Sequence, residues 1–255
     1  MNEKSSKYHD FYEKGYVKLP FKLSEELVDA AVNEIGKNYN YGSADYNLNN
    51  RVENAWTFSR SVRQIASDQR ILDFLAEIFH GEAFPFQTLN FEKGSEQKLH
   101  SDFYHFACSE YDKMVGVWVA LENIDPTSGP LRVVPKSHKL PYLFPKDLNL
   151  KIGTKKNPYE YYKYYENCIE ELVAREGMLS EVIVLQKGEI LIWHSNLIHG
   201  GTPIEDPSKT RLSQVTHYFQ KNRLYFTPIQ SLKNLLFRRY RNPYNILTGQ
   251  RIYHF

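Results

Sequence analysis

The sequence predicts a mainly β protein, a sandwich or barrel with helices packed against its outside. Short segments rich in β-branched and aromatic residues follow one another over about residues 83–220, separated by turn residues such as Lys187-Gly188. About residues 1–82 instead carry apolar residues at helical spacing. Aromatic residues make up 15% of the chain, which suits strands and stacking pockets.

The N-terminal part contains two expected helices. Ser24 is placed to cap the first, because Glu25 and Glu26 follow in its opening turn, where the helix dipole favours negative charge. The second begins near Ser67, and Gly81 is placed to end it. The expected strands cover residues 84–92, 97–106, 114–124, 131–135, 181–186, 189–194 and 212–220.

The chain of 255 residues shows no internal repeat or flexible linker, so a single domain over residues 1–255 is expected. About residues 140–180 interrupt the strands and include a Tyr-rich segment, 157–168. This insertion is either a lid over a site or a helix whose rings pack on the barrel. About residues 221–255 are basic and lack Asp and Glu, which is typical of a solvated helix face and otherwise of contact with an anionic substrate, a membrane surface or a partner.

Composition argues against several classes of protein. A formal net charge of +2 gives no support for a nucleic-acid partner. The two cysteines, Cys108 and Cys168, form no C-x-x-C pair, and no apolar run suggests a signal peptide or a transmembrane segment. We therefore expect a cytoplasmic protein, whose oligomeric state the sequence does not predict.

Two histidine-containing stretches predict a metal site. On a strand, His100 and Asp102 would share one face, as a buried pair or as part of a catalytic group. The stretch 188–201 adds His194 and His199, and glycines follow His199, as a crowded site requires. Two histidines and one carboxylate form the facial triad of non-haem Fe(II) oxygenases, although zinc accepts the same ligands.

A third stretch favours iron with a dicarboxylate. Arg211 opens the last expected strand and shares a face with Ser213 and His217. An inward guanidinium is costly unless it meets an anion, and it grips a carboxylate with two parallel hydrogen bonds. A dicarboxylate that chelates iron and reaches Arg211 and Ser213 fits both observations, and 2-oxoglutarate has this form.

Taken together, these stretches resemble the phytanoyl-CoA dioxygenase family over about residues 11–220. The resemblance rests on HSD (100–102), SGPLRVVPKSHK (128–139), GEILIWHSNLIHGG (188–201), Arg211 and the opening FYEKGYVKLPFKLSEE (11–26). It implies a double-stranded β-helix core of the jelly-roll or cupin-like kind and a dioxygenase that uses Fe(II), 2-oxoglutarate and O₂. It further implies that His100, Asp102 and His199 are the metal ligands, Arg211 holds 2-oxoglutarate and Trp118 lies beside it.

The chain departs from the family pattern at two positions. Lys136 stands where the family often has Gly, and Gly201 stands where it often has Ser. Because position 201 lacks the serine hydroxyl, the contact of a hydroxyl with the co-substrate shifts to Thr202 or Ser213. Gln87, on the expected strand that comes before His100, is a further candidate contact for the co-substrate. His105 and His217 are either groups beside the ligands or core histidines, and His194 is the rival third ligand.

The expected function is hydroxylation of an aliphatic C–H bond in a small, polar or anionic substrate, with release of succinate and CO₂. Because Asp102 is present, halogenation is disfavoured. The alternatives are a zinc-dependent cupin-like isomerase or hydrolase, and a non-catalytic β-barrel that binds a ligand.

Overall fold

The computed structural model describes residues 3–39, 51–149, 158–231 and 235–253. The helices are α1 Glu3–Lys14, α2 Glu25–Ile35, α3 Arg60–Ala66, α4 Gln69–Phe79 and α5 Pro158–Arg175. The strands are β1 Tyr16–Lys18, β2 Arg51–Glu53, β3 Ala83–Phe91, β4 Ala107–Cys108, β5 Met114–Ala120, β6 Leu131–Val133, β7 Glu181–Ile183, β8 Ile190–His194, β9 His199–Gly201, β10 Ser213–Gln220, β11 Tyr225–Phe226, β12 Tyr244–Asn245 and β13 Gln250–Arg251.

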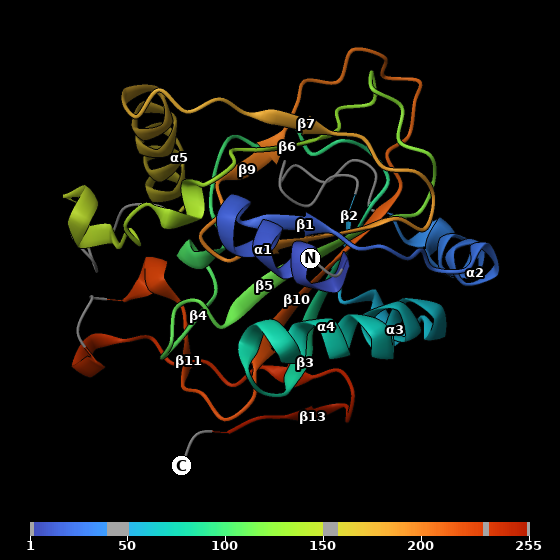
Figure 1. Cartoon of the computed structure of the whole chain (residues 1–255), viewed down its shortest axis with the longest axis horizontal. Helices are drawn as coiled ribbons and strands as arrows, with labels where there is room; N and C mark the ends of the chain where they lie inside the picture. Colours follow the sequence, from blue (N-terminus) through green and yellow to red (C-terminus); the bar gives the residue numbers. More distant parts are fainter. Residues whose placement is uncertain (1–2, 40–50, 150–157, 232–234, 254–255) are drawn as a thin grey trace.

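Two antiparallel sheets form the centre of the molecule. The larger has the order β1-β8-β5-β10-β3-β2, and the smaller has the order β7-β6-β9 (Figure 1). Their facing sides share one apolar cluster, in which Trp118 and Val215 of the large sheet meet Leu131 and Val133 of the small one. This arrangement places the space between the sheets beside β5, β10 and β9.

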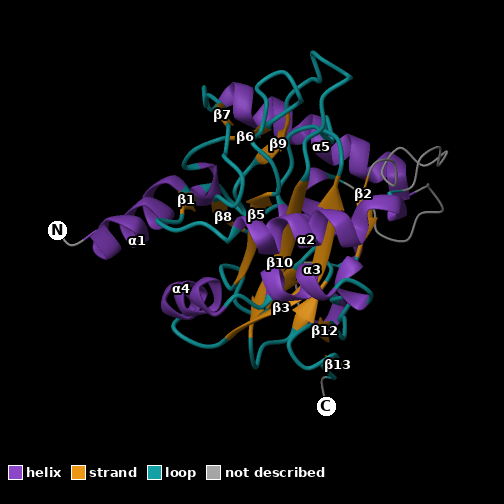
Figure 2. Ribbon diagram, turned by 90° about the vertical axis from the view of Figure 1, so that its right-hand side faces the viewer, coloured by secondary structure: helices purple, strands orange, loops and turns teal. Residues whose placement is uncertain are grey.

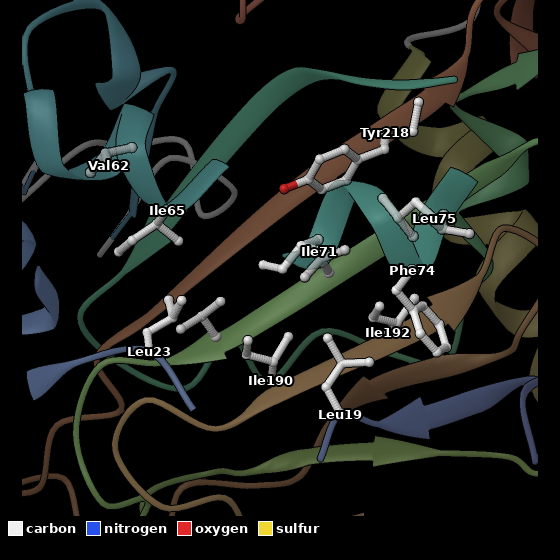
Figure 3. Packing of buried hydrophobic residues seen from close by; sticks show 14 of the residues in the cluster. Leu19, Leu23, Val62, Ile65, Ile71, Phe74, Leu75, Ile190, Ile192 and Tyr218 are labelled. Atoms are coloured by element: carbon white, nitrogen blue, oxygen red, sulfur yellow. The ribbon is translucent and has the colours of Figure 1, made fainter. Parts of the chain in front are cut away.

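Helices α2, α3 and α4 cover the other face of the large sheet (Figure 2). Figure 3 shows Ile65 of α3 and Ile71 and Leu75 of α4 lying over Ile190 and Ile192 of β8. Because both faces of β5 are covered, its residues form one continuous buried run rather than an alternating pattern.

The expected helix ends are partly as predicted. Ser24 caps α2, since its side chain accepts a hydrogen bond from the Leu27 backbone N–H. Asp68 caps α4, but the residue that ends it with left-handed backbone is His80, at φ 54°, and Gly81 comes one position later. The helix end predicted from the sequence, at Gly81, is therefore one residue later than the observed end at His80.

The insertion and the C-terminal segment both pack on the core. Part of the insertion forms α5, whose Tyr165, Ile169 and Val173 are buried; residues 150–157, with the first residue of the Tyr-rich segment, lie outside the described part. The described part of the basic segment forms β11, two short 3₁₀ helices and the pair β12–β13 rather than an α-helix. Throughout the described ranges, every helix is too short or too polar to cross a bilayer.

Candidate metal centre

The inner face of the large sheet lines a cavity of about 210 Å³. Strand register sets three rows of residues across β5, β10 and β3, and these rows run from the metal ligands towards Arg211. They are Gly116–His217–Gln87, Trp118–Val215–Leu89 and Ala120–Ser213–Phe91. His100, Asp102, His199 and Arg211 all line this one cavity, so the four residues that the sequence singled out meet there.

The segment that carries His100 and Asp102 differs from the expected strand. His100 forms a single antiparallel bridge with His199, and then the chain turns through a 3₁₀ segment, Asp102–Tyr104. The turn is held because the Phe103 N–H donates to Ser195 O and the His105 N–H donates to Asp102 O. His100 and Asp102 still converge, but a bridge followed by a turn aims them, not the alternation of a strand.

His199 lies in strand β9, whereas the sequence predicted that this residue lies beyond the end of a strand. The backbone N–H groups of His100 and His199 each donate to the other's carbonyl at 2.9 Å. At Gly201 an added Cβ would stand 2.8 Å from the backbone N of Glu96. A serine there would therefore push the neighbouring chain away, which explains this departure from the family pattern.

Potential ligand atoms of His100, Asp102 and His199 lie within 4.8 Å of one another, and all three residues are buried. The Nδ1 atoms of His100 and His199 face the carbonyls of Lys98 and Leu197 at 2.8 and 2.9 Å. Because a carbonyl only accepts, each Nδ1 carries the proton, and each Nε2 is left free to bind a metal.

The Asp102 carboxylate is held through one of its two oxygens. Its Oδ2 accepts a hydrogen bond from the indole N–H of Trp193 at 2.7 Å and lies 3.4 Å from His217 Nε2. Its Oδ1 lies 3.8 Å from His199 Nε2. Trp193 fits because Gly116 faces it across the strands, where a Cβ would come within 2.3 Å of the indole.

Burial and neighbouring charges give these side chains the protonation states that a metal needs. Burial, reinforced by His199, lowers the pKa of His100 to about 3, so this imidazole is neutral at neutral pH. Burial alone would raise the pKa of Asp102, but His217 and His199 outweigh it and hold that pKa below its ordinary value. A neutral imidazole beside a carboxylate is the form that binds a divalent cation.

Arg211 lies at the other end of the cavity and is 4% exposed. Burial lowers its pKa to about 10, with the Glu122 charge opposing the shift, so the guanidinium stays protonated at neutral pH. Among the described residues, its Nη2 donates only to the Lys93 carbonyl, at 3.4 Å, while Glu122 accepts from Thr210 and Leu212 instead. Within the described ranges, no carboxylate pairs with this buried cation.

The other candidate co-substrate contacts differ in whether they line the cavity and in whether their polar atoms are paired. Trp118 and Gln87 line the cavity, and neither Trp118 Nε1 nor Gln87 Oε1 has a hydrogen-bond partner among the described residues. Ser213 is fully buried in the row beside Arg211 and is not itself a lining residue; its Oγ has no hydrogen-bond partner among the described residues. Thr202 is not among the lining residues, and its hydroxyl donates to Pro130 O at 3.2 Å.

His194 is turned away from this cavity. It follows Trp193 on β8 and so faces the other side of the sheet, where its ring lies 5.3 Å from that of His138 and its Nδ1 accepts from the Asn196 N–H. His105 and His217 do line the cavity.

Two functional residues were missed by reasoning from the sequence. Trp193 holds Asp102, and its only signal was the alternation that places it opposite His194. Tyr165 of α5 accepts a hydrogen bond from the Ser101 N–H at 2.9 Å, between the two ligands, and stacks on Tyr104 at 3.7 Å. No local pattern links α5 to the ligand segment.

The basic C-terminal segment supports the wall of the site. The Arg241 guanidinium lies 4.8 Å from the ring of Phe106, a lining residue, and its Nη1 donates to His105 O. Arg238 lies 4.3 Å from the ring of Phe226 and donates to the hydroxyl of Tyr111. These two arginines therefore pack inward on aromatic rings, unlike the solvated face that composition suggested.

Solved structures of low sequence identity share this fold. The carbocyclase SnoK from nogalamycin biosynthesis, described as non-heme and alpha ketoglutarate dependent, has a TM-score of 0.67 at 15% identity and covers 90% of this chain and 88% of its own. EctD from S. alaskensis, solved with 2-oxoglutarate and 5-hydroxyectoine, has a TM-score of 0.65 at 20% identity, over 94% and 86%. The expected double-stranded β-helix is thus confirmed.

Sequence comparison gives the family. Peroxisomal phytanoyl-CoA dioxygenase of Homo sapiens is 32% identical over 114 residues, which is 43% of this chain and 29% of the human protein. The match therefore spans less than a third of that relative. The family model of phytanoyl-CoA dioxygenase (PhyH) matches residues 11–211, which include the three clustered ligand residues and Arg211. The chain belongs to the phytanoyl-CoA dioxygenase family.

Proposed function

We propose that this protein is an Fe(II)- and 2-oxoglutarate-dependent dioxygenase that hydroxylates an aliphatic C–H bond of a small molecule. One observation carries the proposal: a three-ligand set shares a single cavity with a buried arginine that has no carboxylate partner among the described residues. A zinc site would need the first feature but not the second. A buried cation without a partner is costly, and an anionic co-substrate would offset that cost.

In this proposal His100, Asp102 and His199 hold the iron through two Nε2 atoms and one carboxylate oxygen. Arg211 and Ser213 hold the distal carboxylate of 2-oxoglutarate, and the unpaired polar atoms of Trp118 and Gln87 lie along the same wall. Thr202 remains a proposed contact that would first have to release Pro130 O. When bound, iron and 2-oxoglutarate would supply O₂ activation, with succinate and CO₂ as co-products.

The residues of the chain orient the metal ligands and keep water out of the cavity. The Trp193 indole and the two backbone carbonyls fix the ligands before metal arrives, so binding requires little reorganisation. Phe106 and Val215 provide apolar wall beside the ligands. Excluding water from this space would direct the oxidising chemistry to a positioned substrate bond.

The test measures iron binding and succinate formation by two single variants. His199→Ala should lose Fe(II) binding and 2-oxoglutarate turnover, because it removes one of three ligands. His194→Ala, five residues earlier and on the opposite face, should keep both. If wild-type protein with Fe(II) neither binds 2-oxoglutarate nor forms succinate, the proposed function is wrong, and if only His194→Ala loses iron, the ligand set is wrong.

A further inference from the structure

Two charged residues of the cavity take no part in the roles proposed above. Arg51 and Glu53 lie on β2, the edge strand of the large sheet, and both line the cavity that holds the metal ligands. In register, Arg51 is opposite Phe91 and Glu53 is opposite Leu89, and both of those partners line the cavity as well. The pair therefore faces inward from the rim of the site.

Each of the other two charged groups of this wall has its own task. Asp102 belongs to the metal ligands and Arg211 faces the place proposed for 2-oxoglutarate, which leaves Arg51 and Glu53 as the remaining opposite charges. Their own contact is a single one, from Arg51 Nη2 to Glu53 Oε1 at 2.7 Å. Arg51 Nε is buried and has no hydrogen-bond partner among the described residues.

This ion pair contributes little to the fold. The side chains are 21% and 39% exposed, and ion pairs with this degree of exposure typically contribute little to stability. Opening it would therefore cost little. A ligand with an adjacent carboxylate and ammonium group would replace one ion pair by two, and it would also give Arg51 Nε a partner.

We propose that Arg51 and Glu53 recognise the carboxylate and the ammonium group of a zwitterionic substrate, a free amino acid or a small derivative that keeps both charges. The inference rests on the proposed function, since it concerns the substrate of the same cavity. Arg51 binds the carboxylate as a planar fork, and Glu53 accepts from the ammonium group. The carbon skeleton then lies against Leu89 and Phe106, between the charged rim and the metal ligands.

The binding test uses anaerobic calorimetry on the whole 255-residue chain loaded with Fe(II) and 2-oxoglutarate. The probes are L-leucine, L-proline, L-lysine and L-glutamate, each compared with its α-amide and its N-acetyl derivative. We expect at least one free amino acid to bind about tenfold or more tightly than both blocked forms, which is the effect of losing about 1.4 kcal/mol of charge-assisted contact. If no free amino acid is preferred over its blocked forms, the inference is wrong.

Single variants then assign the two charges. Arg51→Gln should abolish the preference for a free carboxylate, and Glu53→Gln should abolish the preference for a free amine. Arg70→Gln is the matched control, because Arg70 pairs with Asp68, also two residues away, at 2.8 Å, and neither of them lines the cavity. The control should bind the probes as wild type does. If both cavity variants keep the wild-type preferences, the assignment of these residues is overturned.

Two further readouts separate this inference from the proposed function. Binding of 2-oxoglutarate and succinate release without any probe report on the proposed function alone. If these persist while the probes are not discriminated, only the zwitterion inference fails. If Arg51→Gln weakens 2-oxoglutarate binding about tenfold and leaves probe preference intact, Arg51 serves the co-substrate, and the inference is again wrong.

Discussion

The side chains proposed to bind the metal and those proposed to bind the co-substrate differ in how completely their polar atoms are paired. At the metal end, His100, His199 and Asp102 each have a non-ligating atom held by a carbonyl or an indole N–H. At the Arg211 end, by contrast, Arg211 Nε, Trp118 Nε1 and Ser213 Oγ have no partner among the described residues. Gln87 Oε1 and His217 Nδ1, in the row nearest the metal ligands, also lack a partner among the described residues. Buried polar atoms are normally paired, so the first end is preorganised for an ion and the second is suited to a polar ligand.

The largest expected effect follows from replacing Arg211, which removes the buried cation from its end of the cavity. Arg211→Met should weaken 2-oxoglutarate binding about 100-fold or more, because it removes the buried cation proposed to bind the distal carboxylate. Without ligand, the same variant should be as stable as wild type or more stable by about 1 kcal/mol, since an unpaired buried charge has gone. Calorimetry with 2-oxoglutarate and thermal unfolding measure the two effects.

Metal binding is the control for that variant. Arg211→Met should bind Mn²⁺, used as an air-stable substitute for Fe(II), with wild-type affinity. Unchanged affinity for 2-oxoglutarate would show that the cation has another partner. A large loss of stability without ligand would show that Arg211 is satisfied within the fold, contrary to its contacts.

The second prediction tests the metal end with two tryptophans. Trp193→Phe removes the N–H that holds Asp102 Oδ2, and losing such a supporting hydrogen bond typically lowers metal affinity about 10–100-fold. Trp118→Phe removes an N–H that has no partner among the described residues, so it should leave metal affinity unchanged. Titration with Mn²⁺ compares them, and equal losses in both variants would mean that bulk rather than the hydrogen bond matters.

A smaller effect should follow from the link between α5 and the metal end. Tyr165→Phe leaves the buried Ser101 N–H and Oγ without their partner, which should lower the free energy of unfolding by about 1–2 kcal/mol and weaken metal binding several-fold. Tyr162→Phe, on the same helix, loses only a bond from Gln97 and should keep its metal affinity. Urea unfolding and Mn²⁺ titration report the two effects, and equal metal affinities would show that α5 does not position the ligands.

Much of this architecture is predictable because it is local. The Ser24 cap and the strand segments follow from residue spacing, and the order of His100, Asp102, His199 and Arg211 led to one cavity. Prediction failed where distant segments decide. The turn at Asp102 depends on a hydrogen bond from Phe103 to Ser195, which no pattern in residues 97–106 contains.

The role of Trp193 was hidden for the same physical reason. Its indole reaches Asp102 because the register of β5 and β8 places Gly116 opposite it. Register between strands is set by packing of the whole sheet, not by either strand alone. Periodicity could place Trp193 on the inner face, but it could not show which atom the indole would meet.

The smallest expected effect concerns Lys136, the other departure from the family pattern. Lys136 has φ 68°, in the left-handed region that glycine adopts without strain, and its N–H donates to Lys14 O at 2.8 Å. Lys136→Gly should therefore raise the free energy of unfolding by about 0.5–1 kcal/mol, after allowing for the greater entropy of glycine in the unfolded chain. Lys136→Ala also removes the charge but keeps the strained backbone, so it should give no such gain. Urea unfolding of the three proteins decides, and equal stabilisation by Ala and Gly would assign the effect to the lysine charge instead of the backbone.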